Sequence, residues 1–250
     1  MKVIDIFNFL NSKFPCETAQ DFDNVGLLIG DALCEVTSCI IALDCTKAVI
    51  EKARKQGANL IVTHHPVIFE PLKALAADSI PALCIKNGLS VICMHTNMDV
   101  GIGGVNDVLC EALSLENVKN APTKDGYVLK TATLPYKMSA DELAEYIGKK
   151  LGTAVRYTAE HSPVETVTVC SGSGGSFFED ALSFGTDAFI TGDIKHNVFL
   201  AAVDRGITLI DAGHFYTEDL IVEPLCEMLK NEFSDIKFTT DHTYRVKLFK

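Results

Sequence analysis

Two adjacent histidines, His64 and His65, are the residues whose type and spacing point most directly to metal chemistry. Neighbouring side chains diverge from the backbone, so these two imidazoles are poorly placed to share one ion. Each can instead bind one ion of a pair about 3.5–4 Å apart, the separation found in two-metal hydrolytic sites. Pro66 keeps the backbone of His65 extended. Taken alone, the pair is equally compatible with one buried, hydrogen-bonded histidine beside an exposed one.

The segment from Asp211 to Glu218 carries a second group of ligand-type side chains. Gly213 permits an unusual backbone turn before His214, and Thr217 can cap the helix that Glu218 begins. A carboxylate at this place can point back toward the strand ends and bridge two cations. The plainer interpretation of Glu218 is an acid in the first turn of a helix, where it favours the helix dipole. With His214 four residues earlier, the metal interpretation is preferred.

Two further loops supply candidates for the same site. His95 and Asp99 follow one apolar run, and Asp193 follows another together with Lys195 and His196. Asp99 is a third ligand-type carboxylate. For His95, a role in proton transfer or in contacting a ligand stays open beside that of a satisfied core histidine. We expect Asp193 or His95 to move a proton and Lys195 and His196 to contact the anionic part of a substrate.

All of these residues follow short apolar runs that read as buried strands. The runs cover residues 38–44, 58–63, 89–94, 167–170, 187–191 and 207–211. Helical patterns separate them, and we predict one helix from a Thr46 cap to Gly57 and another from a Ser139 capping box to Gly152. Strands alternating with helices indicate βαβ units and a parallel sheet, whose carboxyl ends are where ligands bind. The alternative is that these ligand-type residues follow the strands by chance, because loops are rich in polar residues in any case.

The same order of elements recurs in the two halves of the chain. Residues 57–65 match residues 185–193, and residues 88–92 match residues 206–210. These matches indicate a degenerate duplication of one half of the chain. The alternative is that unrelated strands that begin with glycine look alike. We therefore predict an α/β fold of two related, intertwined βαβ halves with mostly parallel sheets and added antiparallel strands. The halves are 1–124, with the His-His and His-Thr-Asn-x-Asp loops, and 125–250, with the Thr-Gly-Asp and Gly-His-x-x-x-Glu loops. The added strands are an alternating run at 127–134 and a hairpin around Asp241 and His242.

The amino-acid composition indicates where in the cell the protein is located and which classes of partner are excluded. The 250 residues are 48% hydrophobic and carry a formal net charge of −11, which argues against nucleic acid as a partner. A small anionic ligand stays compatible, because metal ions can invert the local field. The nine cysteines form no Cys-x-x-Cys pair and suit a reducing compartment, so we expect a cytoplasmic protein. No apolar run is long enough to cross a membrane, and no membrane partner is expected.

Seven segments together resemble the Nif-three-like dinuclear metal-centre proteins, often labelled type-two GTP cyclohydrolase I homologues. They are Asp23–Gly30, Leu43–Asp44, Thr63–Pro66, His95–Asp99, Gly103–Asn106, Thr191–His196 and Asp211–Glu218. The resemblance implies a toroidal homohexamer whose metal sites face an internal cavity. It also implies five metal ligands, with Glu218 bridging: His64, His65, Asp99, His214 and Glu218. Asn197 stands where relatives often have another histidine, so the substrate role of that loop is less firmly inherited.

Three imidazoles and two carboxylates suit two divalent ions per chain, with zinc, iron or manganese favoured over calcium. Two ions with open positions would lower the pKa of a bridging water. The function expected is metal-dependent hydrolysis of a small nucleotide-like or phosphorylated substrate, in which Glu218 also serves catalysis. Opening of the GTP ring is one special case. The alternative is a non-catalytic hexamer that binds a partner, acts as a scaffold or handles metal, and the sequence leaves open whether the protein is an enzyme.

Overall fold

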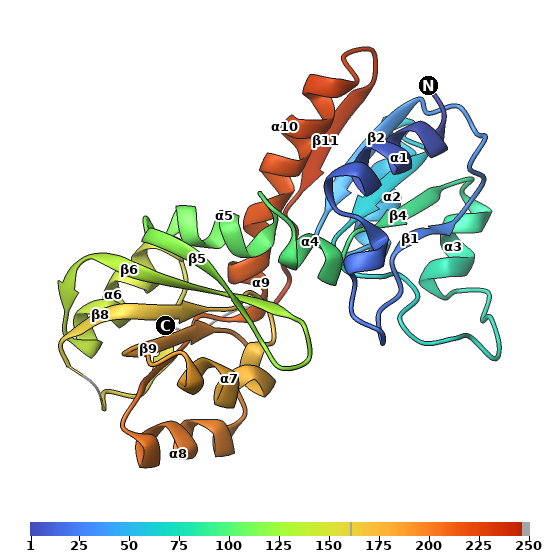
Figure 1. Cartoon of the computed structure of the whole chain (residues 1–250). Coiled ribbons are helices and arrows are strands. Elements are labelled where there is room, and N and C mark those ends of the chain that lie inside the picture. Colours follow the sequence, from blue (N-terminus) through green and yellow to red (C-terminus); the bar gives the residue numbers. More distant parts are fainter. Residues whose placement is uncertain (161, 247–250) are drawn as a thin grey trace. The chain divides into compact units, whose positions relative to one another are not determined.

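The structure is a computed structural model that describes residues 1–160 and 162–246 (Figure 1). The chain packs into two compact units. The first comprises Met1–Ile102 and Ile221–Tyr244, and the second comprises Gly103–Leu220 together with residues 245–246. The expected halves, 1–124 and 125–250, divide the sequence at a different place. The compact units differ from them because a C-terminal segment returns to the first sheet and the 116–138 hairpin belongs wholly to the second.

The first unit is built on a five-stranded sheet. Its order is β1 (Gly26–Ile29), β4 (Ser90–Cys93), β3 (Leu60–Thr63), β2 (Ser38–Ala42) and β11 (Lys237–Asp241). The four strands from β4 to β11 are parallel, and β1 runs antiparallel to β4 at one edge. Every residue of β2, β3 and β4 is buried, which explains why these strands read as continuous apolar runs rather than as alternating ones.

Helices pack around this sheet (Figure 1). They are α1 (Val3–Lys13), α2 (Lys47–Gln56), α3 (Ile80–Lys86), α4 (Thr96–Val100) and α10 (Val222–Glu232), with the short turns η1 (Cys16–Thr18) and η3 (Asp219–Ile221). As predicted, the hydroxyl of Thr46 accepts a hydrogen bond from the Val49 N–H at 3.3 Å, and α2 ends at Gly57, whose φ is +68°. The α2 side chains Val49 and Ala53 pack with Ile40 of β2 in the core.

The second unit contains a six-stranded sheet. Its order is β5 (Glu116–Pro122), β6 (Val128–Met138), β8 (Val164–Val169), β9 (Ala188–Thr191), β10 (Thr208–Asp211) and β7 (Arg156–Tyr157). The central strands β8, β9 and β10 are parallel, whereas β5, β6 and β7 pair antiparallel toward the edges. The fold is therefore mixed α/β with two sheets, parallel at their centres with antiparallel strands added, as predicted.

The helices of the second unit lie before, between and after these strands along the chain. They are α5 (Val105–Ala112), α6 (Ala140–Leu151), α7 (Phe178–Ser183), α8 (His196–Arg205) and α9 (His214–Glu218), with the turn η2 (Gly174–Phe177). The predicted capping box at the start of α6 is confirmed, because Ser139 and Glu142 exchange side-chain and backbone hydrogen bonds. The helix ends at Gly152 in a left-handed conformation, also as predicted. Across the described residues, no helix is long and apolar enough to cross a membrane.

The predicted C-terminal hairpin is wrong. Residues 237–241 do form a strand, but β11 pairs in parallel with β2 of the first sheet, and residues 242–246 form no strand. The rest of the expected second strand, residues 247–248, lies outside the described residues. An ion pair at 2.8 Å between Lys52 of α2 and Asp241 holds the end of β11 in this place. Alternation of apolar residues identified the strand but carried no information about its partner.

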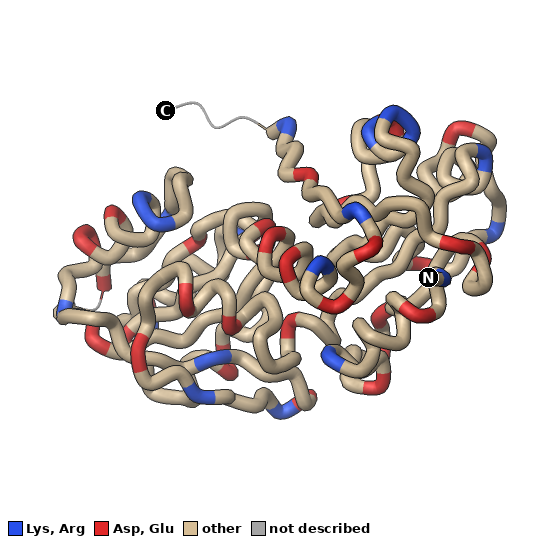
Figure 2. Tube along the Cα trace, turned by 90° about the horizontal axis from the view of Figure 1, so that it is seen from above, with Lys and Arg blue, Asp and Glu red and all other residues tan. Residues whose placement is uncertain are grey.

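Acidic residues are spread along the trace of both units, with basic residues between them, in keeping with the formal net charge of −11 (Figure 2).

Candidate metal centre

The carboxyl ends of two neighbouring strands carry the histidines of the first unit. β3 ends at Thr63, directly before His64 and His65, and β4 ends at Cys93, two residues before His95. Because β3 and β4 pair in parallel, these ends lie side by side. Ligand nitrogens of the three histidines lie within 4.8 Å of one another. This edge of the sheet therefore gathers three imidazoles in one place.

Asp99 joins this cluster from α4, the short helix that begins after His95. Its Oδ1 lies 3.5 Å from Nε2 of His64, and both side chains are almost fully buried. Two donors bound at about 2.1 Å to one tetrahedral ion would stand about 3.4 Å apart. The spacing of Asp99 and His64 therefore fits two ligands of a single divalent ion.

Hydrogen bonds on the far side of the rings orient His64 and His65. The Nδ1 of His64 lies 3.0 Å from the carbonyl oxygen of Met94, and the Nδ1 of His65 lies 2.8 Å from Oδ1 of Asp44. A carbonyl can only accept, so the Nδ1 of His64 donates to it, and Nε2 is the ring nitrogen on the side of Asp99. Histidines that bind metal characteristically donate their other ring nitrogen to a carbonyl or a carboxylate in this way.

His95 has the same kind of partner. Its Nδ1 lies 2.8 Å from Oδ1 of Asp23, whose Oδ2 accepts hydrogen bonds from the backbone N–H and the hydroxyl of Thr96. Burial alone would raise the pKa of Asp23, but the hydrogen bonds from His95 and Thr96 outweigh it and lower the pKa to about 2. Asp23 is therefore an anion at neutral pH and holds the ring of His95 in place.

The second unit carries its own group of ligand-type side chains after β10. Gly213, with a φ of +82°, turns the chain into α9. Nε2 of His214 lies 2.8 Å from Oε2 of Glu218. The Nδ1 of His214 lies 2.8 Å from Oδ2 of Asp193, so this ring too is tied to a carboxylate. Asp193 has a φ of +52°, a strained conformation for a residue other than glycine, of the kind that persists where a side chain must be aimed.

Gly172, in the loop after β8, leaves the space that the carboxylate of Glu218 occupies. A Cβ atom on Gly172 would stand 1.9 Å from Oε1 of Glu218 and 3.3 Å from Nε2 of His214. The backbone N–H of Gly172 donates to the hydroxyl of Thr217 at 3.0 Å, which fixes the loop against α9. Only glycine can stand here while Glu218 keeps this position.

A cavity of about 340 Å³ opens beside Asp193 in the second unit. Its walls are Ser173, Gly175, Ser176, Asp193, Lys195, Asn197 and Val198. Lys195, predicted to contact substrate, therefore lies in one cavity with the residue that orients His214. His196, also predicted to contact substrate, is the first residue of α8; it is exposed and is not among the residues that form this cavity.

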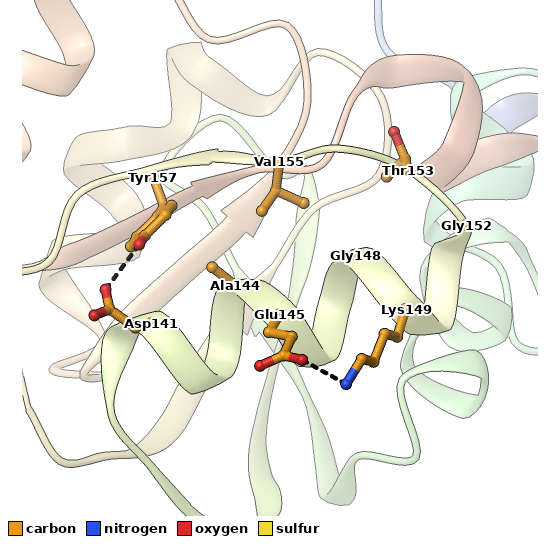
Figure 3. A pocket seen from close by; sticks show the side chains of 9 residues that line it. All are labelled: Asp141, Ala144, Glu145, Gly148, Lys149, Gly152, Thr153, Val155 and Tyr157. Atoms are coloured by element: carbon orange, nitrogen blue, oxygen red, sulfur yellow. Dashed lines mark hydrogen bonds and ion pairs between the residues drawn. The ribbon is translucent and has the colours of Figure 1, made fainter. Parts of the chain in front are cut away.

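A second hollow of about 580 Å³ lies between α6 and the segment that leads into β7 (Figure 3). Its polar side chains pair with one another: the hydroxyl of Tyr157 lies 2.7 Å from Asp141, and Lys149 forms an ion pair with Glu145. None of the site residues predicted from the sequence lines it.

Each unit thus carries several of the predicted residues. The first holds His64, His65, His95 and Asp99, and the second holds His214, Glu218 and Asp193. Imidazole and carboxylate donors with this orientation could hold divalent metal. Sequence reasoning assigned no role to Asp23, Asp44 or Gly172, although the first two lie within segments that carried the family resemblance.

Comparisons with known proteins agree with this picture. The family described as Duf34/NIF3 (NGG1p interacting factor 3) matches residues 1–245. A relative from Clostridium perfringens named "GTP cyclohydrolase 1 type 2 homolog" is 32% identical, with 95% of each chain covered. A hypothetical protein of Staphylococcus aureus superposes with a TM-score of 0.90 at 29% identity, covering 100% of this chain and 99% of the other. Reduced HcgD from Methanocaldococcus jannaschii superposes with a TM-score of 0.84 at 28% identity, covering 96% and 97%. The chain therefore belongs to the Duf34/NIF3 family.

Proposed function

We propose that the protein binds two divalent metal ions and uses them to hydrolyse a small nucleotide-like or phosphorylated substrate. The proposed ligands are His64, His65, Asp99, His214 and Glu218, with Glu218 bridging. The observation that carries the proposal is the orientation of the imidazoles. In His64, His65 and His214 the Nδ1 atom is tied to a carbonyl or carboxylate oxygen, which leaves Nε2 as the ligand atom.

The donor set supports particular metals. Imidazole nitrogens with carboxylate oxygens suit zinc, iron or manganese, whereas calcium prefers oxygen alone. Asp99 and Glu218 are buried, at 5% and 4% exposure, and a bound cation would stabilise a carboxylate in such a place. When bound, the ions would supply a water of lowered pKa and polarise the bond to be broken.

The chain's own residues would do the rest of the chemistry. Lys195 would hold the anionic part of the substrate at the cavity beside Asp193, with His196 at its margin. Asp193, hydrogen-bonded to His214, and His95, hydrogen-bonded to Asp23, would each accept or return a proton. Several relatives carry a GTP cyclohydrolase name, and opening of the GTP ring is one reaction within the proposed class.

The test is turnover. Purified protein reconstituted with zinc, iron or manganese is incubated with a pool of nucleotides and phosphoesters, and products are read by mass spectrometry. We expect the wild type to form a product that Glu218→Ala does not. Glu227→Ala, which alters an exposed glutamate of α10 paired with Lys230, is the matched control and should retain activity. A metal-loaded protein that converts nothing in the pool would overturn the hydrolase.

The alternative is a homohexameric ring that binds metal without catalysis, to hold a partner, act as a scaffold or handle metal. The burial of His64, Asp99 and Glu218 is compatible with it as well, because coordination saturated by protein would leave no position for water. Light scattering would show a hexamer, and metal analysis would show full occupancy without turnover.

We place the protein in the cytoplasm, since no disulfide joins any of its nine cysteines, all of which lie in the described ranges.

A further inference from the structure

Two phenylalanines stand exposed beside the histidine cluster of the first unit. The side chains of Phe22 and Phe69 are 65% and 44% exposed, and their ring centroids are 6.2 Å apart. The ring of Phe69 is also 6.2 Å from the ring of His95, to which it is nearly perpendicular. A continuous run of aromatic rings thus leads from the surface to the candidate metal ligands.

Hydrogen bonds fix both phenylalanines in this place. Phe22 precedes Asp23, whose carboxylate is fully buried and binds His95 and Thr96. Asn24 donates from its side chain to the carbonyl oxygen of Ile68 at 2.5 Å, directly before Phe69. The two loops are therefore tied to each other and to the residue that orients His95.

The exposure of two neighbouring phenylalanine side chains beside the histidine cluster indicates a binding surface. Single apolar side chains scattered over a surface are ordinary, and Leu33, at 65% exposure, is one such residue. Phe22 and Phe69 differ because they contact each other, are held on anchored loops and adjoin a cluster of metal-ligand type. A phenyl ring has no hydrogen-bonding group, so its face recognises an apolar group, a planar π surface or a cation. A nucleobase or similar heteroaromatic ring is such a surface.

We propose that Phe69, supported by Phe22, stacks on the planar heteroaromatic ring of the substrate and so selects nucleotide-like molecules over sugar phosphates of equal charge. This rests on the proposed function, because the ring must belong to a molecule bound at the metal site. Loss of one stack between a base and an aromatic side chain weakens binding about five- to 150-fold. That factor sets the discrimination expected between a ligand with the ring and one without it.

The test is calorimetric titration of the metal-loaded full chain with guanosine 5′-monophosphate and, in parallel, with ribose 5-phosphate. The wild type should bind the nucleotide about five- to 150-fold more tightly. Phe69→Ala should lose most of this preference while its affinity for ribose 5-phosphate stays within about two-fold. Phe69→Leu, which keeps an apolar side chain without a ring, should behave like Phe69→Ala. Leu33→Ala should behave like the wild type.

Metal content, measured on the same samples, separates this proposal from the function beneath it. A wild-type protein that takes up no metal would contradict the proposed function. A metal-loaded wild type that binds both ligands equally, or neither, overturns the stacking proposal alone. The proposal is also overturned if Phe69→Ala leaves the preference intact but changes the mass seen by light scattering, because the pair would then be a contact between copies of the chain.

Discussion

Replacement of Gly172 by alanine should displace Glu218 from the proposed metal centre without replacing any proposed ligand. The added Cβ would stand 1.9 Å from Oε1 of Glu218, and an ordinary contact begins at about 3.4 Å. The carboxylate or the loop must therefore move by roughly 1.5 Å, whereas metal–ligand distances tolerate only about 0.2 Å. Because Glu218 is proposed to bridge the two ions, its displacement should weaken metal binding at least about 100-fold. This is the upper end of the effect of disturbing a residue that merely supports a ligand.

The same substitution also strains the backbone, so a matched control is needed. Gly172 has a φ of +62°, and a residue with a Cβ pays about 1–2 kcal/mol there. Gly185 has a φ of +69° with nothing within 4 Å of the added atom. Gly185→Ala should therefore lose a similar amount of stability and keep its metal.

The assay is metal affinity by competition with a chelator, beside urea unfolding of each variant. The reasoning predicts comparable losses of stability in both variants and loss of metal affinity only in Gly172→Ala. Wild-type affinity in Gly172→Ala would refute it, as would an equal loss of metal from Gly185→Ala.

Other predictions concern orientation, acid stability and the core. Asp44→Asn should weaken metal binding about 10–100-fold because His65 loses its anionic partner. The control Asp31→Asn, at an exposed turn, should leave the metal affinity unchanged. Equal affinities for the two variants would contradict this. Burial opposes ionisation of Asp241, but the hydrogen bond from Lys52 helps hold its pKa below the usual value, so its contribution to stability is present above about pH 4 and is lost as the pH falls through the lowered pKa. Urea unfolding should show a deficit for Asp241→Asn at pH 7 that shrinks as the pH falls through the lowered pKa of Asp241, and a deficit independent of pH would count against the ion pair. Ile40→Ala, at a fully buried position in β2, should cost about 2–5 kcal/mol in the free energy of unfolding, and a cost below about 1 kcal/mol would mean that this core is misassigned.

The strands and their polar ends could be predicted because local patterns carry them. An apolar run that stops directly before His64, or three residues before His214, already indicates a buried strand whose carboxyl end carries ligand-type side chains. The helix limits at Thr46 and Gly57 follow from residues that act within one turn. Such features need no knowledge of distant contacts.

The supporting residues could not be predicted in this way. Asp23 orients His95 across 72 positions of the sequence, and only the folded loops bring the two together. The need for glycine at position 172 depends on where Glu218 points. The pairing of β11 with β2 joins segments that are far apart in the sequence, and an alternating pattern does not indicate which strand will be the partner. Residues that act through another residue leave little trace in a single sequence.

The most direct test of the central claim is metal stoichiometry of the full chain by plasma mass spectrometry after reconstitution, for the wild type, His64→Ala and His214→Ala. The account predicts two ions per chain in the wild type and a loss of metal in each variant while circular dichroism shows both still folded. A folded wild type with less than one ion per chain, or variants that keep the full complement, would contradict it.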